Sequence, residues 1–256
     1  MPETSIELGG LTVAIAADDA VTRLARARYE AFLTSAPARW HLQILVEPEA
    51  RPTIDVLRAE RDGDVVTVTR SDVRGTISMT DRRATASLYA ADELPLDAFI
   101  RVLFSLALIE HGGLLVHAAS LVRDGRAYLF PGRSGAGKTT LARMAPDATL
   151  LSDELSLVRD GRAWGTPFWG ELARGGEPMS APLAAIYFPE QAAHHAARPL
   201  GTGDAHRRLL TTVLFFPRDP ELVRSVFAIA AELAGRTPCF ALSFRKDPGV
   251  WSVVNA

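Results

Sequence analysis

Residues 132–139, GRSGAGKT, match the pattern G-x-x-x-x-G-K-[ST] in full. They follow a stretch typical of a strand and precede a stretch typical of a helix, which is the context that a phosphate-binding loop needs. In such a loop the glycines let backbone amides point inward, and the helix that follows offers its positive end. The lysine reaches the terminal phosphates, and the threonine hydroxyl can ligate magnesium. The residues predicted to bind nucleotide phosphates are Gly132, Arg133, Ser134, Gly135, Ala136, Gly137, Lys138, Thr139 and Thr140. Capping of the helix is an equal alternative for Thr140, and an exposed position is the alternative for Arg133.

Two further features could supply acid–base chemistry beside this loop. His117 lies fifteen residues before Gly132 on a predicted strand, and the pair Asp153-Glu154 ends the strand predicted after the loop helix. A hydroxyl is a poor nucleophile until a positioned carboxylate accepts its proton. An imidazole can donate to phosphate oxygens or orient that carboxylate, and an acidic residue at a strand end can instead hold magnesium through water. The phosphate-binding loop, His117 and the acidic pair together therefore indicate phosphoryl transfer.

Two large classes of phosphate-loop proteins do not fit the spacing. Transporter ATPases carry a long insertion with an LSGGQ-like signature before their acidic strand, whereas LLSDE follows Thr139 here after only about fourteen residues. A small GTPase would need an NKxD-type motif to read its base, and the sequence contains none.

The combination of HAAS, PGRSGAGKT and LLSDE resembles the catalytic domain of HPr kinase/phosphorylase and its relatives. These enzymes are bacterial serine kinases whose phosphate-loop core is similar to that of phosphoenolpyruvate carboxykinase. The resemblance covers roughly residues 112–190, about a third of the chain, and its specificity comes from His117 and the acidic pair rather than from the loop alone.

The resemblance implies a role for each matching residue. Lys138 would clamp the phosphates, Thr139 would bind the metal ion, and His117 would lie near the transferred phosphate. Glu154 stands where the family has the aspartate that removes the proton from the target serine. Because glutamate is one methylene longer than aspartate, either Glu154 or Asp153 could be the base. Asp153 is also a candidate metal ligand.

The family also has an acidic residue followed closely by Arg-Gly, on a loop that closes over the site. WGELARGG offers Glu171 as a metal ligand and Arg174 as a group that neutralises charge on the phosphoryl group. The spacing here is E-x-x-R, one residue longer than the family's E-x-R, so the correspondence is loose. A solvated loop is the alternative for both residues.

These features predict an ATP- and Mg²⁺-dependent kinase that transfers the γ-phosphoryl group to a serine hydroxyl of a protein or peptide, with a modified-peptide precursor as one version. The alternatives are transfer to a small molecule, nucleotidyl transfer, and a nucleotide-binding regulatory module with weak ATPase activity. The reverse, phosphorylase reaction is not expected, because the region linked to it is not recognisable after Leu200. The sequence leaves the acceptor and the oligomeric state open, and a homo-oligomer is possible.

The fold expected from these elements is α/β, with a P-loop kinase core of the HPr kinase/phosphoenolpyruvate carboxykinase type and a small α+β N-terminal domain. Residues 1–94 are predicted to form the N-terminal domain, from a strand at 10–17, a helix at 18–33, and short strands at 40–47, 75–81 and 84–91. A pair of strands within 54–70 is expected to be joined at Asp62-Gly63-Asp64. Residues 95–256 are predicted to form the kinase domain. It would open with a helix at 95–113 that leads into strands at 113–123 and 126–132, hinged on Asp124-Gly125. A hairpin that turns on Asp160-Gly161 is expected at 155–165. Further helices are expected near 204–215 and at 219–236.

Composition excludes several other classes. The formal net charge is -2 with no basic block, so nucleic acid is not an expected partner. The longest apolar window is interrupted by charged residues and glycines, so no membrane span is expected, and the N-terminus lacks the pattern of a signal peptide. The one cysteine, Cys239, suits a reducing cytoplasm and is expected to be a buried strand residue. His194-His195 is expected on an exposed loop rather than at a metal.

Overall fold

The computed structural model describes residues 1–47 and 55–254, and its contacts divide the chain into two units. The first contains residues 1–111 and 215–225, and the second contains residues 112–214 and 226–256. The boundary therefore follows the helix that was predicted to open the second domain at residue 95. That helix packs with the strands before it, which sequence periodicity alone does not reveal.

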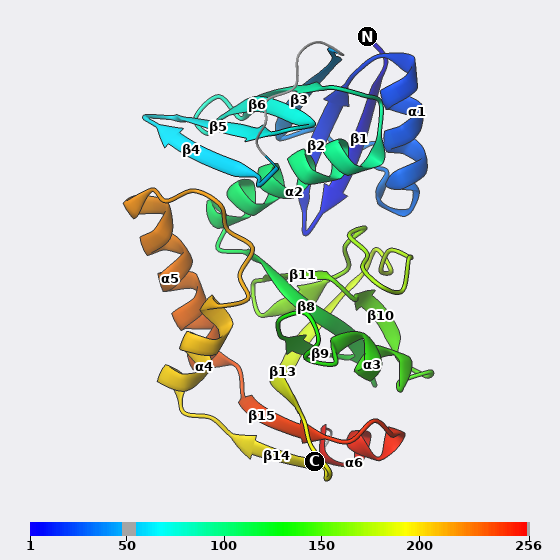
Figure 1. Ribbon diagram of the computed structural model, residues 1–256, viewed down its shortest axis with the longest axis vertical. Helices are drawn as coiled ribbons and strands as arrows, with labels where there is room; N and C mark the ends of the chain where they lie inside the picture. Colours follow the sequence, from blue (N-terminus) through cyan, green and yellow to red (C-terminus); the bar gives the residue numbers. More distant parts are fainter. Residues whose placement is uncertain (48–54, 255–256) are drawn as a thin grey trace. The chain divides into compact units, whose positions relative to one another are not determined.

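A seven-stranded sheet forms the first unit, with the strand order β1-β2-β3-β7-β6-β5-β4 (Figure 1). Strand β3 pairs in parallel with β2 and β7, and the other neighbours pair antiparallel. Burial alternates along β3, which is expected when only one face of a sheet is covered. The strands are β1 (Glu3–Leu8), β2 (Leu11–Ala16), β3 (Trp40–Val46), β4 (Arg58–Asp62), β5 (Val65–Arg70), β6 (Val73–Ser78) and β7 (Arg83–Leu88).

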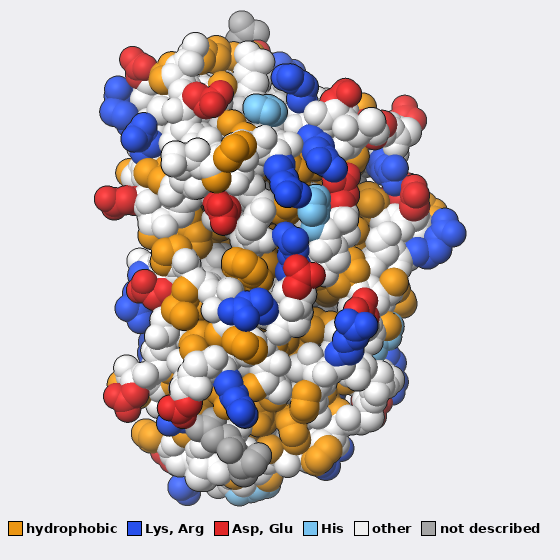
Figure 2. Space-filling model, turned by 180° about the vertical axis from the view of Figure 1, so that it is seen from behind, with side chains coloured by type: hydrophobic (Ala, Val, Ile, Leu, Met, Phe, Trp, Pro, Cys, Tyr) orange, Lys and Arg blue, Asp and Glu red, His pale blue; other side chains and the backbone are white. Residues whose placement is uncertain are grey.

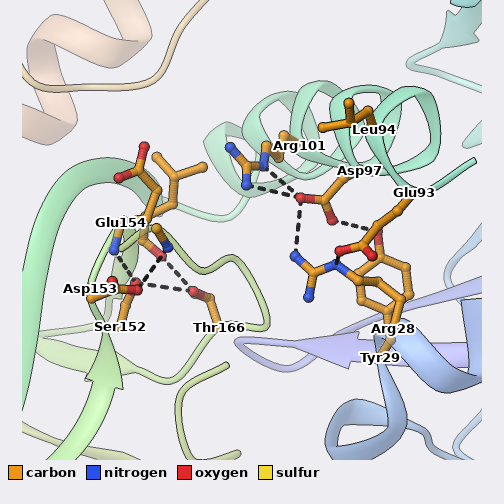
Figure 3. Close-up of polar contacts among 12 residues, drawn as sticks. Arg28, Tyr29, Glu93, Leu94, Asp97, Arg101, Ser152, Asp153, Glu154 and Thr166 are labelled. Atoms are coloured by element: carbon orange, nitrogen blue, oxygen red, sulfur yellow. Dashed lines mark hydrogen bonds and ion pairs between the residues drawn. The ribbon is translucent and has the colours of Figure 1, made fainter. Parts of the chain in front are cut away.

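Helices α1 (Asp19–Arg28) and α2 (Glu93–Ile109) supply the other half of this core, with the short η1 (Glu30–Phe32) after α1. A Cβ added to Gly75 on β6 would lie 2.6 Å from a ring carbon of Phe99, so α2 packs closely against the sheet. The carboxylate of Asp97 on α2 accepts hydrogen bonds from Arg28 at 3.1 Å and from the Tyr29 hydroxyl at 2.9 Å (Figure 3). This buried network joins the two helices.

An eight-stranded sheet forms the second unit, with the order β10-β8-β11-β12-β13-β15-β14 and with β9 paired to both β8 and β13. The first half of β8 pairs with β11 and the second half with β9, so β8, β11, β12, β13 and β9 form a closed path. These strands are β8 (Leu114–Arg123), β9 (Arg126–Pro131), β10 (Thr149–Ser152), β11 (Leu155–Arg159), β12 (Arg162–Trp164), β13 (Ser180–Gln191), β14 (Ala196–Pro199) and β15 (Cys239–Phe244).

The helices of this part of the chain are short, apart from α5, whose first residues are grouped with the first unit. They are α3 (Lys138–Arg143), α4 (Thr202–Leu210), α5 (Pro220–Arg236), η2 (Pro248–Val250) and α6 (Trp251–Val254). Tyr128, Phe130, Leu141, Tyr187 and Phe244 belong to one buried cluster, so β9, α3, β13 and β15 share a core. This core holds the segment between β9 and α3 in place.

The prediction of a mixed α/β fold is confirmed, and most strands lie where they were expected. The predicted helix 18–33 ends at Arg28, and the helix expected to reach residue 215 ends at Leu210. Strands β1 and β14 were not predicted, and Ile54, the first residue of the segment 54–70 predicted to hold a strand pair, lies outside the described residues. Cys239 is buried on β15, as predicted. No helix in the described part of the chain is long and apolar enough to cross a membrane.

Candidate active site

A cavity of about 480 Å³ in the second unit contains most of the residues singled out from the sequence. It lies between the segment after β9, the start of α3, the middle of β8, and the ends of β13 and β15. Its lining comprises His117, Gly132, Arg133, Ser134, Gly135, Gly137, Lys138, Thr139, Thr140, Glu154, Glu171, Gln191, Thr211, Thr212 and Lys246. Residues far apart in sequence therefore face one hollow.

The loop from Gly132 to Gly137 has a conformation that requires glycine at two positions. Gly135 and Gly137 have φ angles of 82° and 98°, which side chains rarely adopt. A Cβ on Gly137 would lie 2.4 Å from the ring of Phe244, so the end of β15 fills the space that glycine leaves. Gln191 donates a hydrogen bond to the carbonyl of Gly135 at 2.9 Å. The loop is thus held by neighbouring strands.

Lys138 begins α3 and points back along the loop, where its Nζ donates to the carbonyl of Arg133 at 3.1 Å. Burial lowers the pKa of this ammonium, and the carboxylates of Glu154, Glu171 and Asp153 oppose that shift. A half-buried lysine beside carboxylates and loop amides provides a fixed positive charge in the cavity.

His117 and Glu154 lie side by side at the cavity wall. His117 Nδ1 is 3.7 Å from Glu154 Oε1, and their side chains are 40% and 33% exposed. Two backbone hydrogen bonds fix the arrangement, since the Ala118 amide donates to the Glu154 carbonyl and the Gly132 amide donates to the His117 carbonyl, both at 3.1 Å. The imidazole, the carboxylate and the loop are therefore tied to one another through the backbone.

Asp153 has a different environment from its neighbour. It is 1% exposed, and its two carboxylate oxygens accept hydrogen bonds from the amides of Gly170 and Leu172, each at 2.9 Å. It is absent from the cavity lining, whereas Glu154 is present. In Figure 3, Asp153 lies among the contacts around Ser152 and Thr166. Asp153 thus holds the segment that carries Glu171.

The glycine-rich segment after β12 packs tightly on β10. A Cβ on Gly176 would lie 1.7 Å from the Leu151 carbonyl oxygen, and one on Gly170 would lie 2.9 Å from the Glu154 carboxylate. Glu171 lines the cavity, but Arg174 is exposed and does not. Ala136 is likewise absent from the lining, although its loop neighbours are present.

The oxygen donors in the cavity suit a hard divalent cation. The Thr139 hydroxyl and the Glu171 and Glu154 carboxylates all line it, and oxygen is the donor type that Mg²⁺ prefers. Within residues 1–47 and 55–254, no group of three or more His, Cys, Asp or Glu side chains could hold a metal ion.

Four lining residues were missed by sequence reasoning, namely Gln191, Thr211, Thr212 and Lys246. They lie at the end of β13 and just after α4 and β15, far along the chain from the loop. No motif marks the first three. For Lys246 a signal exists, because it is one of only two lysines in the chain.

The fold and cavity define a two-unit α/β protein with a G-x-x-x-x-G-K-T loop beside a histidine–glutamate pair. The family model described as SynChlorMet cassette protein ScmC matches residues 94–256, which include the whole second unit, so the chain belongs to this family. No curated protein matches the chain.

Proposed function

We propose that the protein is an ATP-dependent kinase that transfers the γ-phosphoryl group to a serine hydroxyl of a protein or peptide. The observation that carries this proposal is the His117–Glu154 pair, which lies in the same cavity as Lys138 and the glycine loop. A proton acceptor and a phosphate-binding loop in one cavity are the two parts that transfer to a hydroxyl requires.

The loop supports nucleotide binding through charge and shape. Lys138 supplies an ammonium, and the glycines at 132, 135 and 137 let a phosphate approach the backbone. Thr139 and Glu171 would hold Mg²⁺, which on binding would offset charge on the phosphates. ATP and Mg²⁺ are thus the proposed substrate and metal.

Glu154 is the better candidate for the base. Its carboxylate faces the cavity, whereas both oxygens of Asp153 already accept backbone hydrogen bonds away from it. In the proposed reaction Glu154 accepts the proton of the serine hydroxyl while that oxygen attacks the γ-phosphorus, and ADP leaves with the electrons of the broken P–O bond. Asp153 contributes indirectly, because it holds the segment that carries Glu171.

His117 is proposed to orient Glu154 and to donate to phosphate oxygens. Its Nδ1 is close enough to Glu154 for a modest change of rotamer to give a hydrogen bond, since the separation is 3.7 Å. Arg174 remains a candidate to neutralise phosphoryl charge only if its exposed segment approaches the cavity.

The wider proposal includes a P-loop kinase core of the HPr kinase/phosphoenolpyruvate carboxykinase type and a cytoplasmic location. The order of β8, β9, the loop and the acidic pair supports this type of core. ATP as substrate, together with a single buried thiol, supports a cytoplasmic location.

The test is an assay of purified protein with Mg²⁺, γ-labelled ATP and serine-containing peptides, read by mass spectrometry. Phosphorylation adds about 80 Da to the peptide, whereas nucleotidyl transfer of AMP adds about 329 Da. A protein that binds ATP tightly and modifies no acceptor would instead be a regulatory nucleotide-binding module. Lys138→Ala serves as the inactive control.

A further inference from the structure

The chain uses lysine at only two positions, Lys138 and Lys246, although it contains 28 lysine and arginine residues. The rest of these 28 residues are arginine. Both lysines line the same cavity, although they lie more than a hundred positions apart. Lysine carries a compact point charge, which suits contact with phosphate oxygens in a confined space.

The end of β15 brings Lys246 to the loop. Phe244, the last residue of this strand, packs its ring into the space that Gly137 leaves, with its Cζ 2.4 Å from the position of an added Cβ. Lys246 follows two residues later and is exposed in the cavity. The contact between Phe244 and Gly137 therefore fixes the position of the backbone just before Lys246.

A set of polar contacts holds the backbone on either side of Lys246. Asp247 Oδ1 lies 3.0 Å from His195 Nε2 and accepts a hydrogen bond from the Gly249 amide at 2.9 Å. The Arg245 guanidinium also donates to Asp247, and the Arg245 amide donates to His195 Nδ1 at 3.4 Å. We call these four residues, His195, Arg245, Asp247 and Gly249, the lysine clasp. His195 was expected on an exposed loop, but its side chain is only 14% exposed.

Lys246 changes the net charge of the cavity lining. The charged lining consists of Arg133, Lys138 and Lys246 against the carboxylates of Glu154 and Glu171. Without Lys246, two cations would face two carboxylates, and a polyphosphate would meet a neutral wall. With Lys246 the lining has a net positive charge, which favours an anionic ligand.

We propose that Lys246 is a second phosphate-binding lysine, which contacts the phosphate chain of the nucleotide and is positioned by the lysine clasp. This inference rests on the proposed function, because it assigns a further residue to the same nucleotide site. Lys138 extends from the loop itself, and Lys246 approaches from the end of β15.

The first test uses an acyl-phosphate derivative of ATP, in which the amine of a lysine beside the phosphates attacks the acyl carbon and releases ATP. Because the chain has two lysines, the acylated peptide identifies the residue. Acylation of both Lys138 and Lys246, with protection by excess ATP, is the expected result. Acylation of Lys138 alone would overturn the inference and leave the proposed function standing. If neither lysine is acylated and no ATP binds, the proposed function itself fails.

The second test measures binding of ATP and adenosine by calorimetry at constant ionic strength. Lys246→Ala should weaken ATP binding about ten- to a hundredfold, the usual effect of one charge-assisted hydrogen bond, and should change adenosine binding by less than about threefold. Lys246→Arg should restore most of the ATP affinity. Arg126→Ala is the matched control, since Arg126 is exposed at the opposite end of β9 from the loop. Equal ATP affinity in Lys246→Ala and the control would contradict the proposal.

Discussion

His117 Nδ1 lies 3.7 Å from Glu154 Oε1, and both side chains face the cavity of the glycine loop. The two residues come from β8 and from the turn after β10, and their backbones are joined by pairing of these strands and β11. An imidazole beside a carboxylate is a pair suited to proton transfer. Asp153, the preceding residue in sequence, is buried instead, and both of its carboxylate oxygens accept hydrogen bonds from backbone amides.

Glu154→Gln should slow phosphoryl transfer by roughly two to four orders of magnitude, because the amide preserves shape and cannot accept the proton. His117→Asn should slow it about a hundredfold. ATP affinity, measured by calorimetry, should stay within a few-fold for both variants. Normal turnover of Glu154→Gln would remove this residue from the role of base.

Asp153→Asn should lower the free energy of unfolding by about 2–3 kcal/mol, since an amide replaces one accepting oxygen with a donor that faces a backbone N–H. Urea denaturation followed by circular dichroism measures the change. Raising Mg²⁺ should not restore activity, because Asp153 does not line the cavity.

Glu171→Gln is the matched control for that variant. Glu171 is exposed and lines the cavity, so its substitution should leave stability within about 0.5 kcal/mol and raise the Mg²⁺ concentration needed for activity. If Asp153→Asn is as stable as Glu171→Gln and its activity returns at high Mg²⁺, Asp153 is a metal ligand after all.

Gly137→Ala should distort the loop and abolish nucleotide binding, because φ is 98° and the new Cβ would meet the Phe244 ring at 2.4 Å. Gly203→Ala is the control, since that glycine lies in α4 with no atom within 4 Å of an added Cβ. The control should bind ATP normally and gain up to about 1 kcal/mol of stability. Comparable ATP binding by both variants would show that the loop does not hold the nucleotide.

The lysine clasp should weaken at low pH. The hydrogen bond from His195, followed by that from Arg245, holds the pKa of Asp247 at about 2, below the value near 3.9 in an unfolded chain. The carboxylate therefore contributes stability that is complete above about pH 5 and is lost as the pH falls from about 4 towards 2. The difference in urea midpoint between the natural protein and Asp247→Ala should shrink over this range. A difference that does not change with pH would contradict the pairing.

Local pattern was enough to predict the loop and most strands, whereas the place of His117 near the acidic pair was implied by the family resemblance. The turn residues Asp124-Gly125 and Asp160-Gly161, all with positive φ, occur where the sequence placed two reversals. The loop, the turns and the strands depend on residues near one another in the chain. The family resemblance, despite the longer spacing, also implied Glu171, which lines the cavity, and Arg174, which does not.

What sequence could not predict depends on long-range packing. Asp153 and Glu154 are adjacent, so their spacing could not reveal that one accepts the amides of Gly170 and Leu172 while the other faces the cavity. Lys246 reaches the loop only because β15 pairs with β13 and ends at Phe244. Figure 2 shows basic, acidic and hydrophobic side chains interspersed on one face of the molecule.

The central claim is that this cavity transfers a phosphoryl group to serine. The most direct measurement compares two peptide libraries, identical except that serine in one is alanine in the other, incubated with the protein, Mg²⁺ and ATP and analysed by mass spectrometry. We expect products heavier by about 80 Da in the serine library alone, lost in Glu154→Gln. Saturable ATP binding with no serine-dependent product, or with products heavier by about 329 Da, would contradict the account.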